Sequence, residues 1–255
     1  MPIRVSLVTG AGRGIGRAIA LGLAKAGHRV AVAARTLDQL DDVAAEIRAG
    51  GGEALPIVAD LLDRPSAARL VDRVNEQWGP IDILVNNAGV GSSQSPKPLV
   101  DFDDDFWDLT MAINVTAPYL LTKRVLPAMI ERSWGRIINI ASINAFIASM
   151  HGAAYTASKH AIAGLTKATA KEVAQHGITA NAICPGVTRS KMNDLRLEYD
   201  AERLGTTFKE LEQAASPLGR RLEPEEIAAA VVFLASDEAR AINGQSIRVC
   251  GGVVT

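Results

Sequence analysis

The 255-residue sequence predicts an α/β protein built on an open, doubly wound parallel sheet with helices on both faces. Two observations support this prediction. Apolar, β-branched runs alternate with longer amphipathic segments, at the spacing typical of βαβ units. The strand-like runs are almost continuously apolar, as in parallel strands buried on both faces, and their repeated β-α-β order favours right-handed crossovers.

The elements follow one another along the whole chain. The strand candidates are Val5–Thr9, Arg29–Ala34, Ala54–Asp60, Ile81–Asn86, Gly135–Ala141, Thr179–Cys184 and Ser246–Val249. The helix candidates are Gly16–Ala26, Leu37–Ala49, Pro65–Trp78, Phe102–Arg132, Ala153–His176 and Pro224–Ala235. No low-complexity linker or internal repeat interrupts this order, so we expect a single domain over residues 1–255.

The alternation of strands and helices is broken once, from Thr188 to Glu223, where the chain is rich in charged residues and has no strand candidate. Ligands bind at the carboxyl ends of the strands in sheets of this kind. We therefore interpret residues 188–223 as a flap over the binding site. The alternative is a pair of surface helices that face only solvent.

The composition argues against several classes of protein. Apolar residues make up 48% of the chain, and 27 Lys and Arg nearly balance 28 Asp and Glu. A nucleic-acid-binding protein usually carries a basic excess, and a membrane span needs about 18 apolar residues without a charge. The start of the chain lacks a signal-peptide pattern, and Cys184 and Cys250 are too few for a disulfide scaffold or a Cys-rich metal site. We expect a cytoplasmic protein that uses no metal, membrane or nucleic acid.

A glycine-rich loop follows the first strand. Its spacing is Gly-x-x-x-Gly-x-Gly from Gly10 through Gly14 to Gly16, with Ile15 where the commoner Gly-x-Gly-x-x-Gly pattern requires glycine. Such a loop brings backbone N–H groups and a helix N-terminus close to a phosphate. Many glycine clusters are only turns, but the position of this one, between the first strand and the first helix, favours a dinucleotide site. Arg13 lies inside the loop.

The end of the second strand bears on the choice of cofactor. Enzymes that prefer NAD place an acid there to bind the ribose 2′-hydroxyl, whereas this strand ends in Arg35, with no acid before Asp38. A guanidinium binds a 2′-phosphate with paired hydrogen bonds, and a carboxylate repels it. Arg35, together with Arg13, favours NADP. NAD stays the alternative, in which case Arg35 only caps a surface loop.

Candidate reacting groups lie in the second half of the chain. Tyr155 and Lys159 are four residues apart, which places them on one face of a helix. Tyrosine has an ordinary pKa of about 10, and a nearby ammonium favours its phenolate, which eases proton exchange with a substrate oxygen. Ser142 follows directly after a strand, so its hydroxyl can reach the same crevice and bind a carbonyl.

Together these motifs resemble those of the short-chain dehydrogenase/reductase family, in its branch of about 250-residue single domains. The resemblance covers essentially the whole chain and implies a Rossmann fold. It rests on Thr9–Gly16, Asn86–Gly89, Asn114, Ser142, Tyr155-x-x-x-Lys159 and Pro185-Gly186, in family order.

The resemblance implies a role for each catalytic residue. Tyr155 would be the general acid in reduction and the base in oxidation, and Ser142 would bind the carbonyl oxygen. Lys159 would bind the nicotinamide ribose and favour the tyrosinate, and Asn114 would hold a water in a proton relay from Lys159.

The resemblance also implies a cofactor-binding set. Asp60 would contact the adenine, and a hydroxyl after Pro185-Gly186 would lie near the carboxamide, for which both Thr188 and Ser190 are candidates. The full expected set is Gly10, Arg13, Gly14, Ile15, Gly16, Arg35, Asp60, Leu61, Asn87, Ala88, Gly89, Tyr155, Lys159, Pro185, Gly186, Thr188 and Ser190.

The substrate is expected to be a small carbonyl compound or alcohol, with an acyl thioester as one option. Residues 177–186 resemble those of both 3-ketoacyl carrier-protein reductases and 3-hydroxybutyrate dehydrogenases. The NADP signal favours a reductase of a ketone or 3-ketoacyl-type substrate, with an NAD-dependent alcohol or 3-hydroxyacid dehydrogenase as the alternative. The expected substrate-binding residues are Ser142, Asn144, His151, Tyr155 and Val187, with Met192 and the flap close by.

Two further expectations concern partners. A non-catalytic dinucleotide sensor is a remote alternative, because such proteins typically lose the tyrosine or lysine that this chain retains. The resemblance also implies a homotetramer paired through the long helical segments 102–132 and 153–176.

Overall fold

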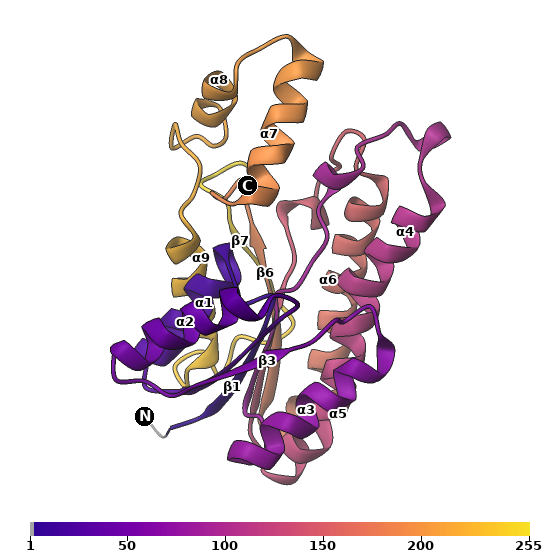
Figure 1. Cartoon of the computed structure of the whole chain (residues 1–255). Helices are drawn as coiled ribbons and strands as arrows, with labels where there is room; N and C mark the ends of the chain where they lie inside the picture. The colour runs from indigo at the N-terminus through magenta and orange to yellow at the C-terminus, as the bar shows by residue number, and fades with distance from the viewer. Residues whose placement is uncertain (1–2) are drawn as a thin grey trace.

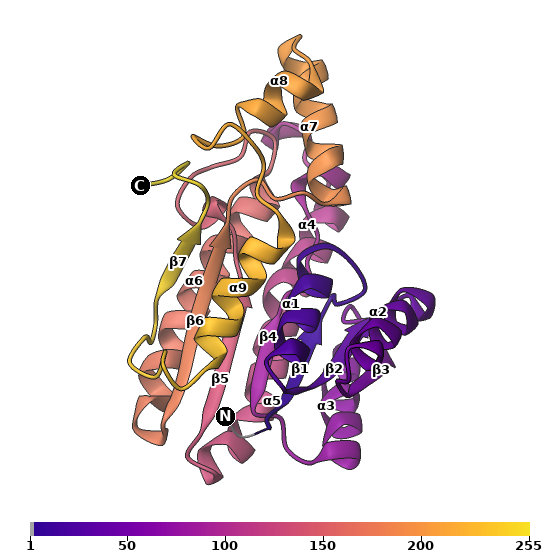
Figure 2. The same cartoon turned by 90° about the vertical axis from the view of Figure 1, so that its left-hand side faces the viewer.

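The computed structural model describes residues 3–255 and contains one seven-stranded parallel sheet. The strand order is β3-β2-β1-β4-β5-β6-β7, so the chain moves outward in one direction from β1 and then in the other from β4, which is the predicted doubly wound arrangement (Figure 2). The strands are β1 (Val5–Thr9), β2 (Arg29–Ala34), β3 (Ala54–Val58), β4 (Ile83–Asn86), β5 (Gly135–Ile140), β6 (Ile178–Pro185) and β7 (Ser246–Val249).

Helices cover both faces of this sheet (Figure 1). One face carries α1 (Gly14–Lys25), α2 (Leu37–Ala49) and α9 (Pro224–Ala235). The other carries α3 (Arg64–Trp78), α4 (Asp104–Met111), α5 (Ala117–Glu131) and α6 (Ala153–Val173). No helix in the part of the chain that the structure describes is long and apolar enough to span a membrane.

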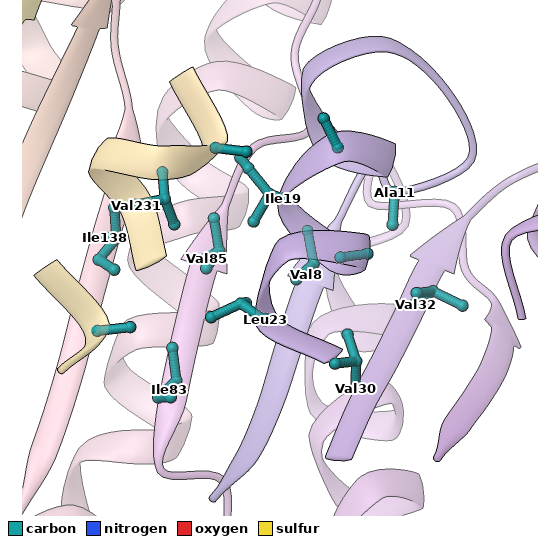
Figure 3. Close-up of a cluster of buried hydrophobic side chains, with 14 of the residues drawn as sticks. Val8, Ala11, Ile19, Leu23, Val30, Val32, Ile83, Val85, Ile138 and Val231 are labelled. Carbon is teal, nitrogen blue, oxygen red and sulfur yellow. The ribbon is translucent and has the colours of Figure 1, made fainter. Parts of the chain in front are cut away.

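Each face of the sheet has its own apolar core. Ile19 and Leu23 of α1 pack with Val231 of α9 over the first face, as Figure 3 shows. On the second face, Leu121 and Met129 of α5 are fully buried. Burial on both faces explains why the strands show no alternation of polar and apolar residues.

Three strands are shorter than predicted, β5 by a single residue, since it ends at Ile140 rather than Ala141. β3 ends at Val58 rather than Asp60, because its ladder partner β2 ends at Ala34, opposite Val58. β4 begins at Ile83 rather than Ile81, and the Asp82 carboxylate accepts a hydrogen bond from the Val5 backbone N–H at 3.0 Å. At this end of the sheet the Asp82 carboxylate, rather than a backbone carbonyl, thus accepts the Val5 N–H.

The long helix predicted over Phe102–Arg132 is present but not uniform. It begins at Asp104, and the π-helical segment Ala112–Thr116 interrupts the α-helical pattern between α4 and α5. Its first turn is capped by Asp103, whose side chain accepts the Asp105 and Phe106 backbone N–H groups. The residue in the middle of the π segment is Asn114, and π-bulges often mark functional positions.

Residues 188–223 contain two helices, α7 (Lys191–Leu204) and α8 (Phe208–Gln213), above the carboxyl ends of the strands (Figure 1). One parallel bridge between Thr188 and Leu222 closes the base of the segment, a pairing that sequence analysis missed. Leu197 is the one buried residue of α7, and α8 buries none of its described residues. The two helices match the surface-helix alternative in form, although their location is that expected of a flap.

Candidate active site

Ser142, Tyr155 and Lys159 come together at the carboxyl end of β5. Ser142 follows the strand in an extended conformation and caps the 3₁₀ turn Ile143–Ala145, while Tyr155 and Lys159 project from the first two turns of α6. The Ser142 hydroxyl lies near enough to the Tyr155 phenol to affect its pKa. The Lys159 ammonium nitrogen lies 5.4 Å from the centre of the Tyr155 ring. The predicted cluster of reacting groups therefore exists as a geometric unit.

The electrostatics of Tyr155 differ from the expectation. Burial raises the pKa of Tyr155, and the Ser142 hydroxyl opposes that rise. The sequence suggested that Lys159 would favour the phenolate, but burial dominates in this structure. A phenol with a raised pKa stays protonated at neutral pH, which suits the donation of a proton.

Lys159 is almost fully buried, and its ammonium donates a hydrogen bond to the Ile140 backbone carbonyl at 2.9 Å. Burial lowers the pKa of Lys159 to about 8. An ammonium has three N–H donors, so two stay free for another ligand. A pair of ribose hydroxyls is one ligand that two adjacent donors can bind.

Asn114 connects this cluster to the loop after β4. Its amide oxygen accepts the Val90 backbone N–H at 2.8 Å, and its nitrogen donates to the Val90 carbonyl and the Ser158 hydroxyl, both at 3.0 Å. Both side-chain donors are thus used within the protein. The predicted water-holding role stays a prediction, and the contacts that the structure shows are those of a brace between the β4 loop and α6.

The glycine loop has the shape needed to approach a phosphate. Gly10 and Gly14 have φ angles of +63° and +54°, which glycine adopts without strain. A Cβ placed on Gly16 would lie 2.2 Å from the Gly10 carbonyl oxygen, so only hydrogen fits there. The Asn87 side chain fastens the loop by donating to the Thr9 and Gly10 carbonyls at 2.9 and 3.1 Å. The bare backbone at the start of α1 fits a dinucleotide phosphate.

Arg13 and Arg35 are both exposed, beside this loop. The Ala11 backbone N–H donates to the Ala33 carbonyl at 3.1 Å, which ties the loop to the end of β2. Neither arginine forms an ion pair or a side-chain hydrogen bond within residues 3–255, whereas many other arginines of the chain do. Both guanidinium groups are therefore available to an anionic ligand.

The remaining expected cofactor residues lie around the same strand ends. Ser190 lies across from the glycine loop, because a Cβ on Gly14 would come within 3.6 Å of the Ser190 Cβ. The buried Thr188 hydroxyl donates to the Gly186 carbonyl at 3.0 Å. The Ser190 hydroxyl also has a partner, because it accepts the Asn193 backbone N–H at 3.3 Å and caps α7. Both hydroxyls left open by the sequence therefore stay candidates. Gly186 itself is fixed by crowding, since a Cβ there would lie 2.9 Å from the Cys250 Cα.

Asp60 and Leu61 lie farther out, after β3. The exposed Asp60 carboxylate accepts the Leu62 backbone N–H at 3.0 Å, so it caps a turn. An open hollow of about 640 Å³ lies between β3 and α3 with Asp60 on its wall, and none of Ser142, Tyr155 and Lys159 lines it. The adenine contact expected of Asp60 stays a prediction.

Asn144 and His151, both predicted to bind substrate, differ in their surroundings. The Asn144 amide oxygen accepts a hydrogen bond from the Ser142 hydroxyl at 3.2 Å, so Asn144 orients a reacting group. His151 has a positive φ of 56°, and its Nδ1 lies 2.6 Å from the Tyr199 hydroxyl of α7. His151 thus contacts the flap directly.

Sequence analysis missed the residues through which α7 contacts the protein below it. The Arg196 guanidinium donates to the Met150 carbonyl at 2.9 Å and to the Ser92 hydroxyl at 3.3 Å. The Ser93 hydroxyl donates to the Met192 carbonyl at 3.0 Å. No local pattern distinguishes these residues from an ordinary charged helix surface. Their contacts place α7 across the two loops that flank the cluster.

Known proteins resemble this chain in sequence and in fold. The family model for short chain dehydrogenases matches residues 4–200. The D-beta-hydroxybutyrate dehydrogenase of Cupriavidus necator is 38% identical over 98% of this chain and 98% of its own. The 3-oxoacyl-acyl-carrier-protein reductase of Synechocystis is 38% identical over 98% of this chain and 97% of its own.

The structural comparison agrees. A crystal structure of a variant of actinorhodin polyketide ketoreductase with NADPH has a TM-score of 0.93 and 39% identity, over 98% of this chain and 97% of that one. The fold and the sequence match together, over nearly the full length of each protein. The chain therefore belongs to the short-chain dehydrogenase family and is an NAD(P)-dependent oxidoreductase.

Proposed function

We propose that this protein is an NADP(H)-dependent reductase that acts on a ketone or a 3-ketoacyl-type substrate. The observation that carries the choice of cofactor is the pair of exposed, unpaired arginines, Arg13 and Arg35, beside the glycine loop, with no acid at the end of β2. A guanidinium and a 2′-phosphate form charge-assisted, paired hydrogen bonds. The structural relative with NADPH and the relative named as a 3-oxoacyl-acyl-carrier-protein reductase support the same choice.

Each reacting residue has a step that its position allows. When bound, NADPH supplies the hydride. The Ser142 hydroxyl donates to the substrate carbonyl oxygen and stabilises the charge that develops there. Tyr155 gives its phenolic proton to the same oxygen, which completes the alcohol. The raised pKa of Tyr155 keeps that proton in place until the oxygen becomes basic.

Lys159 and Asn114 prepare this step without taking part in bond formation. The two free N–H donors of Lys159 bind the ribose of the cofactor, and its charge stabilises the tyrosinate left after proton transfer. Asn114 holds the Val90 backbone against α6, which fixes the loop that faces the cofactor. Asn144 orients the Ser142 hydroxyl.

A second candidate function is an NAD-dependent 3-hydroxyacid dehydrogenase. The relative named as a D-beta-hydroxybutyrate dehydrogenase, which is as similar to this chain as the reductase, favours it. The same residues would then act in reverse, with Tyr155 as the base.

The test is a titration of the protein with NADPH and with NADH at one salt concentration, followed by protein fluorescence. We expect NADPH to bind more tightly, and the Arg35→Asp variant to lose about tenfold to hundredfold in NADPH affinity, the worth of one or two charge-assisted hydrogen bonds. NADH affinity should change little. Lys167→Glu, an equal change of charge at an exposed position on α6, is the control and should bind both cofactors as the wild type does.

Equal binding of NADH and NADPH by the wild type, or an NADPH affinity that Arg35→Asp leaves unchanged, would contradict the assignment of NADP. Substrate screening then separates the two functions. A ketone or 3-ketoacyl thioester consumed with NADPH supports the reductase, and a 3-hydroxyacid oxidised with NAD at a higher kcat/KM supports the dehydrogenase.

A further inference from the structure

A chain of polar side chains crosses the core behind the reacting groups. The Asn86 amide on β4 donates to the Asn139 amide oxygen on β5 at 2.8 Å. Asn139 in turn donates to the Thr166 hydroxyl on α6 at 2.9 Å, and Thr166 donates to the Ile162 carbonyl at 2.8 Å. All four residues are buried. The hydrogen bonds run in one direction, from the sheet into α6.

Packing alone does not explain this chain. Its neighbours in the same core are apolar, among them Ile137 and Leu121, and a buried amide stabilises a fold only when its hydrogen bonds are complete. The Asn86 amide oxygen is buried and has no partner among the described residues. A core selected only for stability would hold apolar side chains here. Buried polar groups of this kind often serve to fix one arrangement of the elements that they join.

This chain of polar side chains lies next to the Ile140 carbonyl, which accepts the hydrogen bond from Lys159. Asn139 immediately precedes Ile140, whose carbonyl accepts the Lys159 ammonium at 2.9 Å. The ladder between β4 and β5 ends at the pair Asn86↔Asn139, so Ile140 lies one position beyond the last residue that β4 pairs. On the β4 side the Ile140 carbonyl therefore has no ladder partner and is available to the lysine.

On α6, Lys159, Ile162 and Thr166 are all buried on one face, spaced by three and four residues. The helix packs chiefly against β6 and the turn Ile143–Ala145. The Asn139–Thr166 and Lys159–Ile140 hydrogen bonds tie it to β5 as well. Two attachments, two helical turns apart, determine how far α6 can slide or rotate against that strand.

We propose that Asn139 and Thr166 are positioning residues for Lys159: their hydrogen bond fixes α6 against β5 so that the ammonium meets the Ile140 carbonyl beside Tyr155. This inference rests on the proposed function for the roles of Lys159 and Tyr155. Neither positioning residue touches the reacting atoms. Loss of their hydrogen bond lets Lys159 move toward water, which changes its proton affinity as well as its place.

The test is Thr166→Val, which keeps the shape of the side chain and removes the acceptor of the Asn139 amide. We expect kcat to fall about tenfold, the loss that follows from about 1.4 kcal/mol of misplacement, with KM nearly unchanged. We expect the alkaline midpoint of the pH profile of kcat to move upward by about half a unit or more, because a better-solvated lysine has a pKa closer to its ordinary value. Thr166→Ser keeps the hydroxyl and should restore both properties.

Thr122→Val is the matched control. Thr122 is a buried threonine on α5 that accepts a 3.4 Å hydrogen bond from the same Asn86 amide. Its loss leaves the Asn139–Thr166 hydrogen bond, which reaches α6, in place. We expect the variant to melt at a lower temperature and to keep the wild-type kcat and pH midpoint. If both Thr122→Val and Thr166→Val lost kcat to the same extent and neither shifted the pH midpoint, the polar chain would contribute only to stability. That result would overturn the proposal.

Two further variants keep the test decisive. If Thr166→Val does not fold, Thr166→Cys offers a weak acceptor of similar size. Its kcat should be lower than that of wild type and its midpoint higher, each by less than the change expected for Thr166→Val. Wild-type values in Thr166→Cys would overturn the proposal. Lys159→Met separates the two hypotheses: if it keeps full turnover, the proposed function of Lys159 fails; if it loses turnover while Thr166→Val does not, only the positioning role fails.

Discussion

Tyr155 and Lys159 stand on a helix that is packed into the sheet, whereas α7 and α8, which lie over the same strand ends, bury very little. The inner face of α6 contributes eight buried residues, and α7 contributes one. The two regions face each other across the candidate active site. They are therefore held in place by different kinds of interaction.

The flap, residues 188–223, is held by ion pairs. The buried Arg221 guanidinium joins Asp194 of α7 at 2.6 Å to Glu212 of α8 at 2.8 Å. Arg196 pairs with Asp200 along α7 at 2.7 Å. All of these partners lie within residues 188–223, so the pairs brace this segment internally rather than join it to the sheet. The comparison teaches that the reacting groups stand on a helix fixed by many buried contacts, whereas the segment above them has few buried residues. We therefore expect the segment to open more easily than the sheet, as a site that admits substrate and then excludes water requires.

The largest expected effect is that of the Tyr155 hydroxyl. Tyr155→Phe should lower kcat by about 10³-fold or more, because a positioned general acid contributes about 10² to 10⁴. Cofactor affinity should stay within about twofold of wild type, since the ring is retained. Steady-state kinetics and a cofactor titration measure the two properties.

Tyr199→Phe is the matched change in the flap, since it also removes one hydroxyl with one close partner, His151. We expect kcat to change less than about threefold, with the larger effect on KM, because the contact closes the flap and moves no proton in the reaction. Equal losses of kcat in the two variants would mean that Tyr155 has no special chemical role.

The next effect concerns stability. Leu121→Ala in the core of α5 should lower the free energy of unfolding by about 2 to 5 kcal/mol, since Leu121 is fully buried. Leu197→Ala in α7 should cost about 1 kcal/mol or less of global stability, because the flap can open without unfolding the sheet. Urea denaturation gives the free energies, and hydrogen exchange over residues 191–213 reports the local opening. A global loss from Leu197→Ala as large as that from Leu121→Ala would show that flap and sheet unfold as one unit.

The same contrast explains what the sequence could predict. The sheet, its order and the helices on its faces follow from apolar runs and short-range spacing. Ser142, Tyr155 and Lys159 were found because each occupies a fixed position relative to a strand end or a helical turn. These features depend on neighbours in the chain. The structure confirms the fold and brings the three side chains together.

Features that depend on distant parts of the chain were missed. Asn139 lies in an apolar run that predicts an ordinary strand, and Thr166 in an unremarkable helical segment; only the folded chain brings them within hydrogen-bond distance. The contact between His151 and Tyr199 depends on how α7 folds back over the sheet. The pKa direction of Tyr155 was missed for the same reason, because burial outweighs the nearby charge.

The smallest expected effect is a change in the free energy of unfolding with pH, which depends on the buried Lys159 ammonium. Burial lowers the pKa of Lys159 to about 8 in the folded protein, whereas an unfolded lysine has a pKa of about 10.4. Below the folded value both states carry the proton, and the folded state bears the full cost of the buried charge. Between the two values the unfolded chain binds more protons than the folded one, so stability rises with pH there. A Lys159→Met variant lacks this term.

We therefore expect the stability of wild type, measured relative to Lys159→Met by urea denaturation, to rise by about 2 kcal/mol between about pH 8 and about pH 10. The acid side serves as the internal control. Glu210 of α8 and Glu226 of α9 accept hydrogen bonds that lower the pKa of each to about 2, so the stability that they contribute is lost as the pH falls from about 4.5 toward 2. Wild type and Lys159→Met both carry these glutamates. The difference between their free energies of unfolding should therefore stay constant in acid and change only in alkali. A constant separation from about pH 5 to about pH 10 would mean that Lys159 keeps its ordinary proton affinity and that its charge is not buried at this site.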